Sequence, residues 1–128
     1  MNTDSTNLAS RPLDLVFVGL SLSSSWGNGH ATTYRGLLSA LADRGHQLFF
    51  LERDVPWYAQ NRDLEVPPYC RLALYENLEE LKERFAERIR QADAVIIGSY
   101  VPESPEVIAW IQSTAQGAVA FYDIDTPL

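Results

Sequence analysis

The chain has one cysteine, one lysine and no long run of apolar residues. A single cysteine, Cys70, can form neither an internal disulfide nor a cysteine-based metal site. The longest uncharged stretch, residues 15–34, contains serines, glycines, Asn28 and His30, so no membrane-spanning segment is expected. Residues 1–10 are mostly polar and contain no lysine or arginine, whereas a secretory signal has a positively charged start and an apolar centre. We therefore expect a cytoplasmic protein, and the residues indicate neither a metal nor a cofactor.

Positive charge is also scarce. Ten basic residues stand against 17 acidic ones, which gives a net charge of -7. An acidic domain repels a phosphate backbone, so nucleic-acid binding is not expected. A local arginine site for a phosphate or a sugar remains open.

The composition that is present is that of a globular core. The chain has 128 residues, of which 46% are apolar, enough for one domain. We expect a flexible leader over residues 1–12 and a single folded domain over residues 13–128. Apolar runs rich in β-branched and aromatic residues predict five strands, and 3.6-residue periodicity predicts three helices. The strands cover 13–20, 47–51, 71–75, 94–98 and 118–122, and the helices 30–44, 77–92 and 104–114, with an irregular connection over 52–68.

Strands that alternate with helices predict an α/β domain with a parallel sheet. Right-handed crossovers favour a Rossmann-like doubly wound sheet with the strand order 3-2-1-4-5. Ligands in such sheets bind beyond the carboxyl ends of the strands, where the strand order reverses. The loops after the first and fourth strands are therefore expected to form the functional rim.

The loop after the first strand contains Trp26, Gly27, Asn28 and Gly29 and leads into a helix near His30. Glycines let backbone N–H groups approach a ligand, and a helix N-terminus favours an anion. The spacing does not match a dinucleotide fingerprint or a P-loop. The same glycines also suit a simple strand-to-helix connection, and both interpretations stay open. Without a ligand, we expect residues 21–29 to be exposed or poorly ordered.

His30 is the main candidate for proton transfer, because an imidazole can act as a general base near neutral pH. Asp123 and Asp125 follow the fifth strand at the same rim, and either could orient the ring. The alternative is that His30 is an exposed helix residue and that the aspartates only terminate the strand. His46, at the opposite end of the sheet, is expected to be structural.

The connection after the second strand contains Arg53, Asp54, Trp57 and Tyr58. Aromatic faces beside polar groups suit a sugar ring, which has both C–H patches and hydroxyls. A loop pinned to the domain by Trp57 and by internal ion pairs is the alternative, slightly favoured interpretation.

These residues resemble a family. Residues 27–30 (GNGH), 52–58 (ERDVPWY) and 121–127 (FYDIDTP) look like those of bacterial glycosyltransferases related to spore-maturation proteins. The resemblance covers residues 13–128. It implies a GT-B enzyme, in which two Rossmann-like domains face each other across a cleft. The N-terminal domain mostly holds the acceptor and the C-terminal domain mostly holds the nucleotide-sugar donor.

By this resemblance the chain is the acceptor-side half of a glycosyltransferase, without the donor domain and inactive alone. His30 matches the position of the acceptor's general base in some of these families, with Asp123 or Asp125 as its helper. In a retaining enzyme His30 would instead contact the sugar or phosphate. The nucleotide-sugar donor and the acceptor are the implied partners, and the isolated domain is expected to self-associate through an apolar face. The alternative function is a non-catalytic α/β module that binds a nucleotide or a partner protein.

Overall fold

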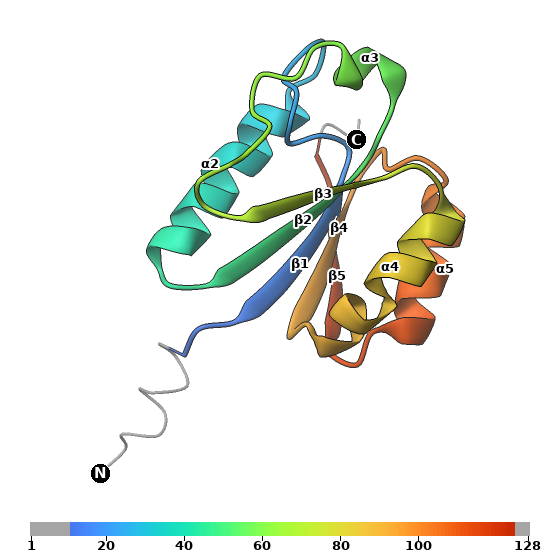
Figure 1. The fold of residues 1–128 in the computed structure, drawn as a ribbon. Helices are drawn as coiled ribbons and strands as arrows, with labels where there is room; N and C mark the ends of the chain where they lie inside the picture. Colours follow the sequence, from blue (N-terminus) through green and yellow to red (C-terminus); the bar gives the residue numbers. More distant parts are fainter. Residues whose placement is uncertain (1–10, 125–128) are drawn as a thin grey trace.

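A computed structural model describes residues 11–124 of the chain (Figure 1). The sheet contains five strands, and four helices connect them. The strands are β1 (Asp14–Gly19), β2 (Gln47–Arg53), β3 (Arg71–Tyr75), β4 (Ala94–Gly98) and β5 (Ala118–Tyr122). The helices are α2 (His30–Asp43), α3 (Pro56–Ala59), α4 (Leu78–Gln91) and α5 (Ser104–Thr114).

All pairs of neighbouring strands are parallel, and the strand order is β3-β2-β1-β4-β5. This confirms the α/β, Rossmann-like sheet that the sequence predicts. Val16 of β1 pairs with Phe49 of β2 on one side and with Val95 of β4 on the other. The most buried strand therefore lies at the centre, where both of its edges are hydrogen-bonded.

The helices lie on both faces of the sheet (Figure 1). Helix α2 covers one face, where Tyr34 and Leu38 pack on Phe17 and Phe50. Helices α4 and α5 cover the other face, where each contributes buried apolar side chains to a second core. That core includes Val16, Val18, Leu81, Phe85, Ile89, Val95, Val107 and Ile111. Successive side chains of each central strand thus point alternately into one core and the other.

Local signals in the sequence set the start of α4 and the end of α2. The side chain of Asn77 accepts a hydrogen bond from the backbone N–H of Glu80, which caps α4. Glu80 in turn pairs with Arg84 one turn later, as the i,i+4 spacing predicts. Gly45 has a φ of 92° just after α2, a left-handed conformation that glycine adopts without strain.

Three predicted details differ in the structure. Strand β2 extends to Arg53 rather than ending at residue 51, because β3 pairs with it up to that point. The connection after it includes a short helix, α3, with Pro56 in its first turn. The sequence Ser104-Pro105 is typical of a serine cap followed by a proline in the first turn, but Ser104 is already helical and Glu103 precedes it with a φ of 56°.

Strand β5 is an edge strand with much of its surface exposed, and Phe121 has 58% of its surface accessible. Self-association through such a surface stays a prediction. No helix within residues 11–124 has the length and apolar character needed to span a membrane.

Candidate functional site

An open pocket of about 370 Å³ lies at the carboxyl ends of the strands. Its lining comes from the loop after β1, from α3 and from the loop after β4, namely Leu20, Gly27, Asn28, Gly29, His30, Tyr58 and Tyr100. Strands β1 and β4 are neighbours in the sheet, and the chain runs outward from them in opposite directions. The pocket therefore lies where the strand order reverses, the place where such sheets bind ligands.

His30 and Tyr100 face each other in this pocket. Their ring centroids are 5.6 Å apart and the rings meet edge to face. His30 has only 4% of its surface exposed, whereas Tyr100 has 56% exposed. Tyr100 also has a φ of 65°, a conformation that costs free energy in a non-glycine residue. The strained backbone thus holds an exposed phenol against a buried imidazole, and this contact was not foreseen from the sequence.

Asn28 gives the glycine-rich loop its shape. Its side-chain amide donates to the carbonyl oxygens of Ser24 and Trp26, and its Oδ1 accepts from the N–H of Ala31. Gly27 has a φ of 64°, so the turn requires a residue that tolerates this conformation.

The first turn of α2 contains no acidic residue. The positive end of the helix dipole is therefore available to an anion or an oxyanion in the pocket.

Glu52 anchors the first part of this loop. Its buried carboxylate accepts hydrogen bonds from the N–H groups of Leu22 and Ser23, at 2.7 and 3.0 Å, and from Ser23 Oγ at 2.7 Å. As a result Ser21, Leu22, Ser23 and Ser24 are fully buried. The expectation of an exposed or poorly ordered loop over residues 21–29 is therefore wrong for residues 21–24. The sequence signal for this buried anchor is Glu52 itself, an acidic residue at the end of an apolar strand.

A second set of contacts ties the connection after β2 to the same loop. Asp63 accepts from Arg35 Nη2 at 2.6 Å and from Ser25 Oγ at 2.7 Å. These hydrogen bonds, first from Arg35 and then from Ser25, hold the pKa of the Asp63 carboxyl well below its usual range. The backbone N–H groups of Asp63 and Leu64 also donate to Ser23 O.

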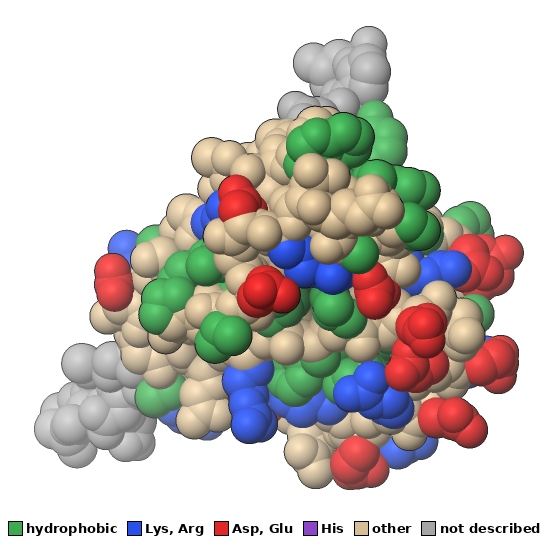
Figure 2. All heavy atoms as spheres, turned by 45° about the horizontal axis from the view of Figure 1, so that its top comes forward, with side chains coloured by type: hydrophobic (Ala, Val, Ile, Leu, Met, Phe, Trp, Pro, Cys, Tyr) green, Lys and Arg blue, Asp and Glu red, His purple; other side chains and the backbone are tan. Residues whose placement is uncertain are grey.

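The two charged residues that the sequence predicts to bind substrate, Arg53 and Asp54, each form an ion pair with another residue of the chain. Arg53 pairs with Glu103 at 2.7 Å, and Asp54 pairs with Arg62 at 2.8 Å. Figure 2 turns the top of Figure 1 forward, and basic and acidic side chains lie side by side in the middle of this face. Neither Arg53 nor Asp54 lines the pocket, and a role for them in binding stays a prediction.

The aromatic residues of the two loops differ in their exposure. Trp26 and Trp57 have 54% and 52% of their surface exposed, whereas Tyr58 is buried and lines the pocket. The connection is therefore held by Tyr58 and by ion pairs, and Trp57 does not pin it to the domain. Each tryptophan is the sequence neighbour of a lining residue, Gly27 or Tyr58, but neither tryptophan lines the pocket itself.

Asp123 does not line the same pocket as His30. Asp123 is exposed and lines a separate pocket of about 240 Å³ between the ends of β4, β5 and the start of α5. Asp125 lies outside the described residues. The pairing of His30 with either aspartate stays a prediction. His46 lies at the opposite end of the sheet, where its Nδ1 accepts a hydrogen bond from the N–H of Leu13 at 3.0 Å.

Within residues 11–124, no group of three histidine, cysteine or acidic side chains is placed to hold a metal ion. Comparison of the sequence with models of known protein families and with curated proteins finds no match. Any assignment of this chain to a family therefore rests on its sequence motifs alone.

Proposed function

We propose that this chain is the acceptor-side domain of a GT-B-type glycosyltransferase, and that the pocket at the rim receives the acceptor. The observation that carries the proposal is the position of His30. It lines a pocket at the point where the strand order reverses, at the first residue of α2. The motif GNGH, which carries the resemblance to these enzymes, forms the same part of the lining.

The chemistry of the lining suits a hydroxylated ring. Tyr58 and Tyr100 supply aromatic surface, and the helix N-terminus supplies backbone N–H groups. Aromatic faces accept the C–H patches of a sugar, while N–H groups bind its oxygens. His30 then removes the proton from the attacking hydroxyl, and the ring of Tyr100 keeps the imidazole in place. The donor is bound by a second domain.

Binding of neutral saccharides to this chain tests the proposal. Methyl glucosides and disaccharides are titrated while the NMR signals of the Gly27 and Gly29 amides and the tryptophan indoles are followed. We expect saturable shifts at these signals, and Tyr100→Ala should weaken binding about five- to tenfold, the usual contribution of an aromatic contact. Phe121→Ala is the matched control, because Phe121 is equally exposed but lines the other pocket.

A nucleotide-binding module is the second candidate. The α2 N-terminus without a neighbouring carboxylate favours it, because this arrangement suits a phosphate. If ADP or UDP shifts the Gly27 and Gly29 amides while no saccharide does, the acceptor proposal is wrong and this candidate replaces it.

A further inference from the structure

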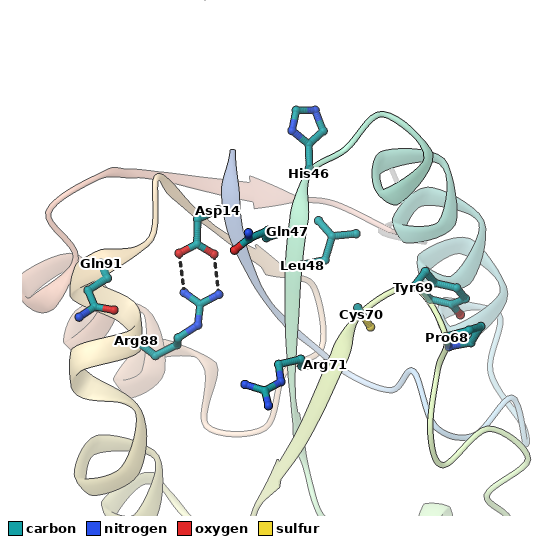
Figure 3. A pocket seen from close by; sticks show the side chains of 10 residues that line it. All are labelled: Asp14, His46, Gln47, Leu48, Pro68, Tyr69, Cys70, Arg71, Arg88 and Gln91. Carbon is teal, nitrogen blue, oxygen red and sulfur yellow. Dashed lines mark hydrogen bonds and ion pairs between the residues drawn. The ribbon is translucent and has the colours of Figure 1, made fainter. Parts of the chain in front are cut away.

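Another pocket lies at the other end of the sheet, away from the rim. It has a volume of about 510 Å³ and is formed by the starts of β1, β2 and β3 and by the last turn of α4 (Figure 3). Pockets that bind small molecules typically have volumes of about 300–1,000 Å³. The proposed acceptor site uses none of its residues.

One wall of this pocket is a fixed guanidinium. Arg88 donates two hydrogen bonds to the carboxylate of Asp14, and its guanidinium lies 5.0 Å from the centre of the Phe49 ring. The ion pair and the ring hold the side chain in one position, so little entropy is lost when a ligand binds to it. The two bonds to Asp14 leave other N–H groups of Arg88 able to donate.

A second guanidinium, that of Arg71, lies on the same side of β2 as Arg88 (Figure 3). Arg71 is exposed at the start of β3, and no carboxylate within residues 11–124 lies within salt-bridge distance of it. Figure 3 shows Arg71 extending toward the pair formed by Arg88 and Asp14, whereas His46 projects away. Because Asp14 offsets Arg88, the lining keeps the positive charge of Arg71 in a chain whose net charge is -7.

Another part of the lining is apolar and suits an organic group. Leu48, Pro68 and Tyr69 border the pocket on the other side of the β2 and β3 starts (Figure 3). An isolated ion would leave this part of the pocket without contacts. A ligand with an anionic head and an apolar or aromatic body would use both parts.

We propose that this pocket binds a small organic anion whose carboxylate or phosphate group is held by Arg71 and Arg88. Arginine suits such groups because its planar N–H pairs match two oxygen atoms at once. The body of the ligand lies over the apolar wall. This site is separate from the rim, so a ligand here is neither acceptor nor donor.

Benzoate, phenyl phosphate and the neutral analogue benzamide are the probes, titrated into the whole chain at low salt and followed by NMR. We expect benzoate or phenyl phosphate to shift the amides of residues 47–48 and 70–72, and the stronger of the two identifies the preferred head group. Benzamide should cause no such shifts, and added salt should weaken binding by the anions, because exposed charges are screened.

The deciding comparison is between the anion affinities of two variants that carry the same arginine-to-glutamine change at different positions. Arg71→Gln removes the uncompensated charge and should weaken binding at least tenfold, the usual effect of losing a charge-assisted hydrogen bond. Arg90→Gln makes the same change two residues after Arg88, on the exposed side of α4, and should leave binding unchanged. Circular dichroism checks that both variants are folded. The proposal is overturned if neither anion causes saturable shifts. It is also overturned if Arg71→Gln binds the anions with the same affinity as the natural chain.

Discussion

The side chain of Tyr34 fills the space that a side chain at Gly98 would need. A β-carbon on Gly98 would overlap the Tyr34 hydroxyl, and one on Gly19 would lie 2.7 Å from the same ring. The ends of β1 and β4 can therefore pass under α2 only because both residues are glycines. Burial of this phenol also raises its pKa well above the usual range.

Gly98→Ala should accordingly destabilise the protein by about 1–3 kcal/mol, the range for overpacked cores. Gly36→Ala is the control, because nothing lies within 4 Å of a β-carbon at that exposed helical position. It should stabilise the protein by about 0.5–1 kcal/mol through helix propensity. Urea denaturation of both variants measures the difference, and equal stabilities would contradict the packing described for Tyr34.

Glu52→Ala should loosen the loop that leads to the pocket. It leaves the buried N–H groups of Leu22 and Ser23 without their acceptor, at a cost of about 1–3 kcal/mol for each unsatisfied group. Hydrogen exchange should accelerate at residues 22–24 more than in β1. Glu65→Ala, an exposed acid in the same connection, is the control and should change neither quantity.

Asp63 should make stability depend on pH in the acid range. Its pKa is lower in the folded chain than in the unfolded chain, so its contribution is present above about pH 4 and is lost as the pH falls. Asp63→Asn should therefore remove part of the loss of stability that occurs as the pH falls below about 4. Asp43→Asn, at the exposed end of α2, should retain it. The effect is small, because the side chain of Asp63 is 49% exposed.

Cys70 should react slowly with thiol reagents. Burial raises the pKa of its thiol to about 11, so little thiolate is present at pH 8. We expect iodoacetamide to label the folded protein much more slowly than the protein in urea. Similar rates in the two states would show that this end of β3 opens readily.

Replacing Tyr100 by glycine should separate stability from binding. Glycine adopts a φ of 65° without strain, so Tyr100→Gly should keep or slightly raise the stability. It also removes the ring that contacts His30, and saccharide binding should fall. Thermal denaturation together with the NMR titration checks both. A large loss of stability would mean that the ring supports the fold and not the pocket.

His30→Ala addresses the proton-transfer role directly. In a protein that joins this domain to a donor-binding domain, we expect turnover to fall about a hundredfold or more, the usual effect of losing a general base. Unchanged turnover with an intact fold would exclude that role, although the domain assignment would stand.

The sequence predicts the sheet well because its signals are local. The apolar run at residues 13–20 predicts a central strand, and Asn77 with Glu80 marks the start of α4. The site is predicted less well, because its key contacts join distant segments. Glu52 meets Ser23 across 29 residues, and Arg53 meets Glu103 across 50. The left-handed backbone of Tyr100 has no local signature, since glycine or asparagine would be expected at such a position.

The central place of β1 also affects how the chain folds during synthesis. One edge of β1 pairs with β2, which leaves the ribosome soon afterwards. The other edge waits for β4, and the hydrogen bond between Asp14 and Asp93 joins residues 79 positions apart. At a typical rate of about 5–20 residues per second, an apolar strand edge stays open for several seconds in the nascent chain. During that interval the growing polypeptide is most exposed to chaperones and to aggregation.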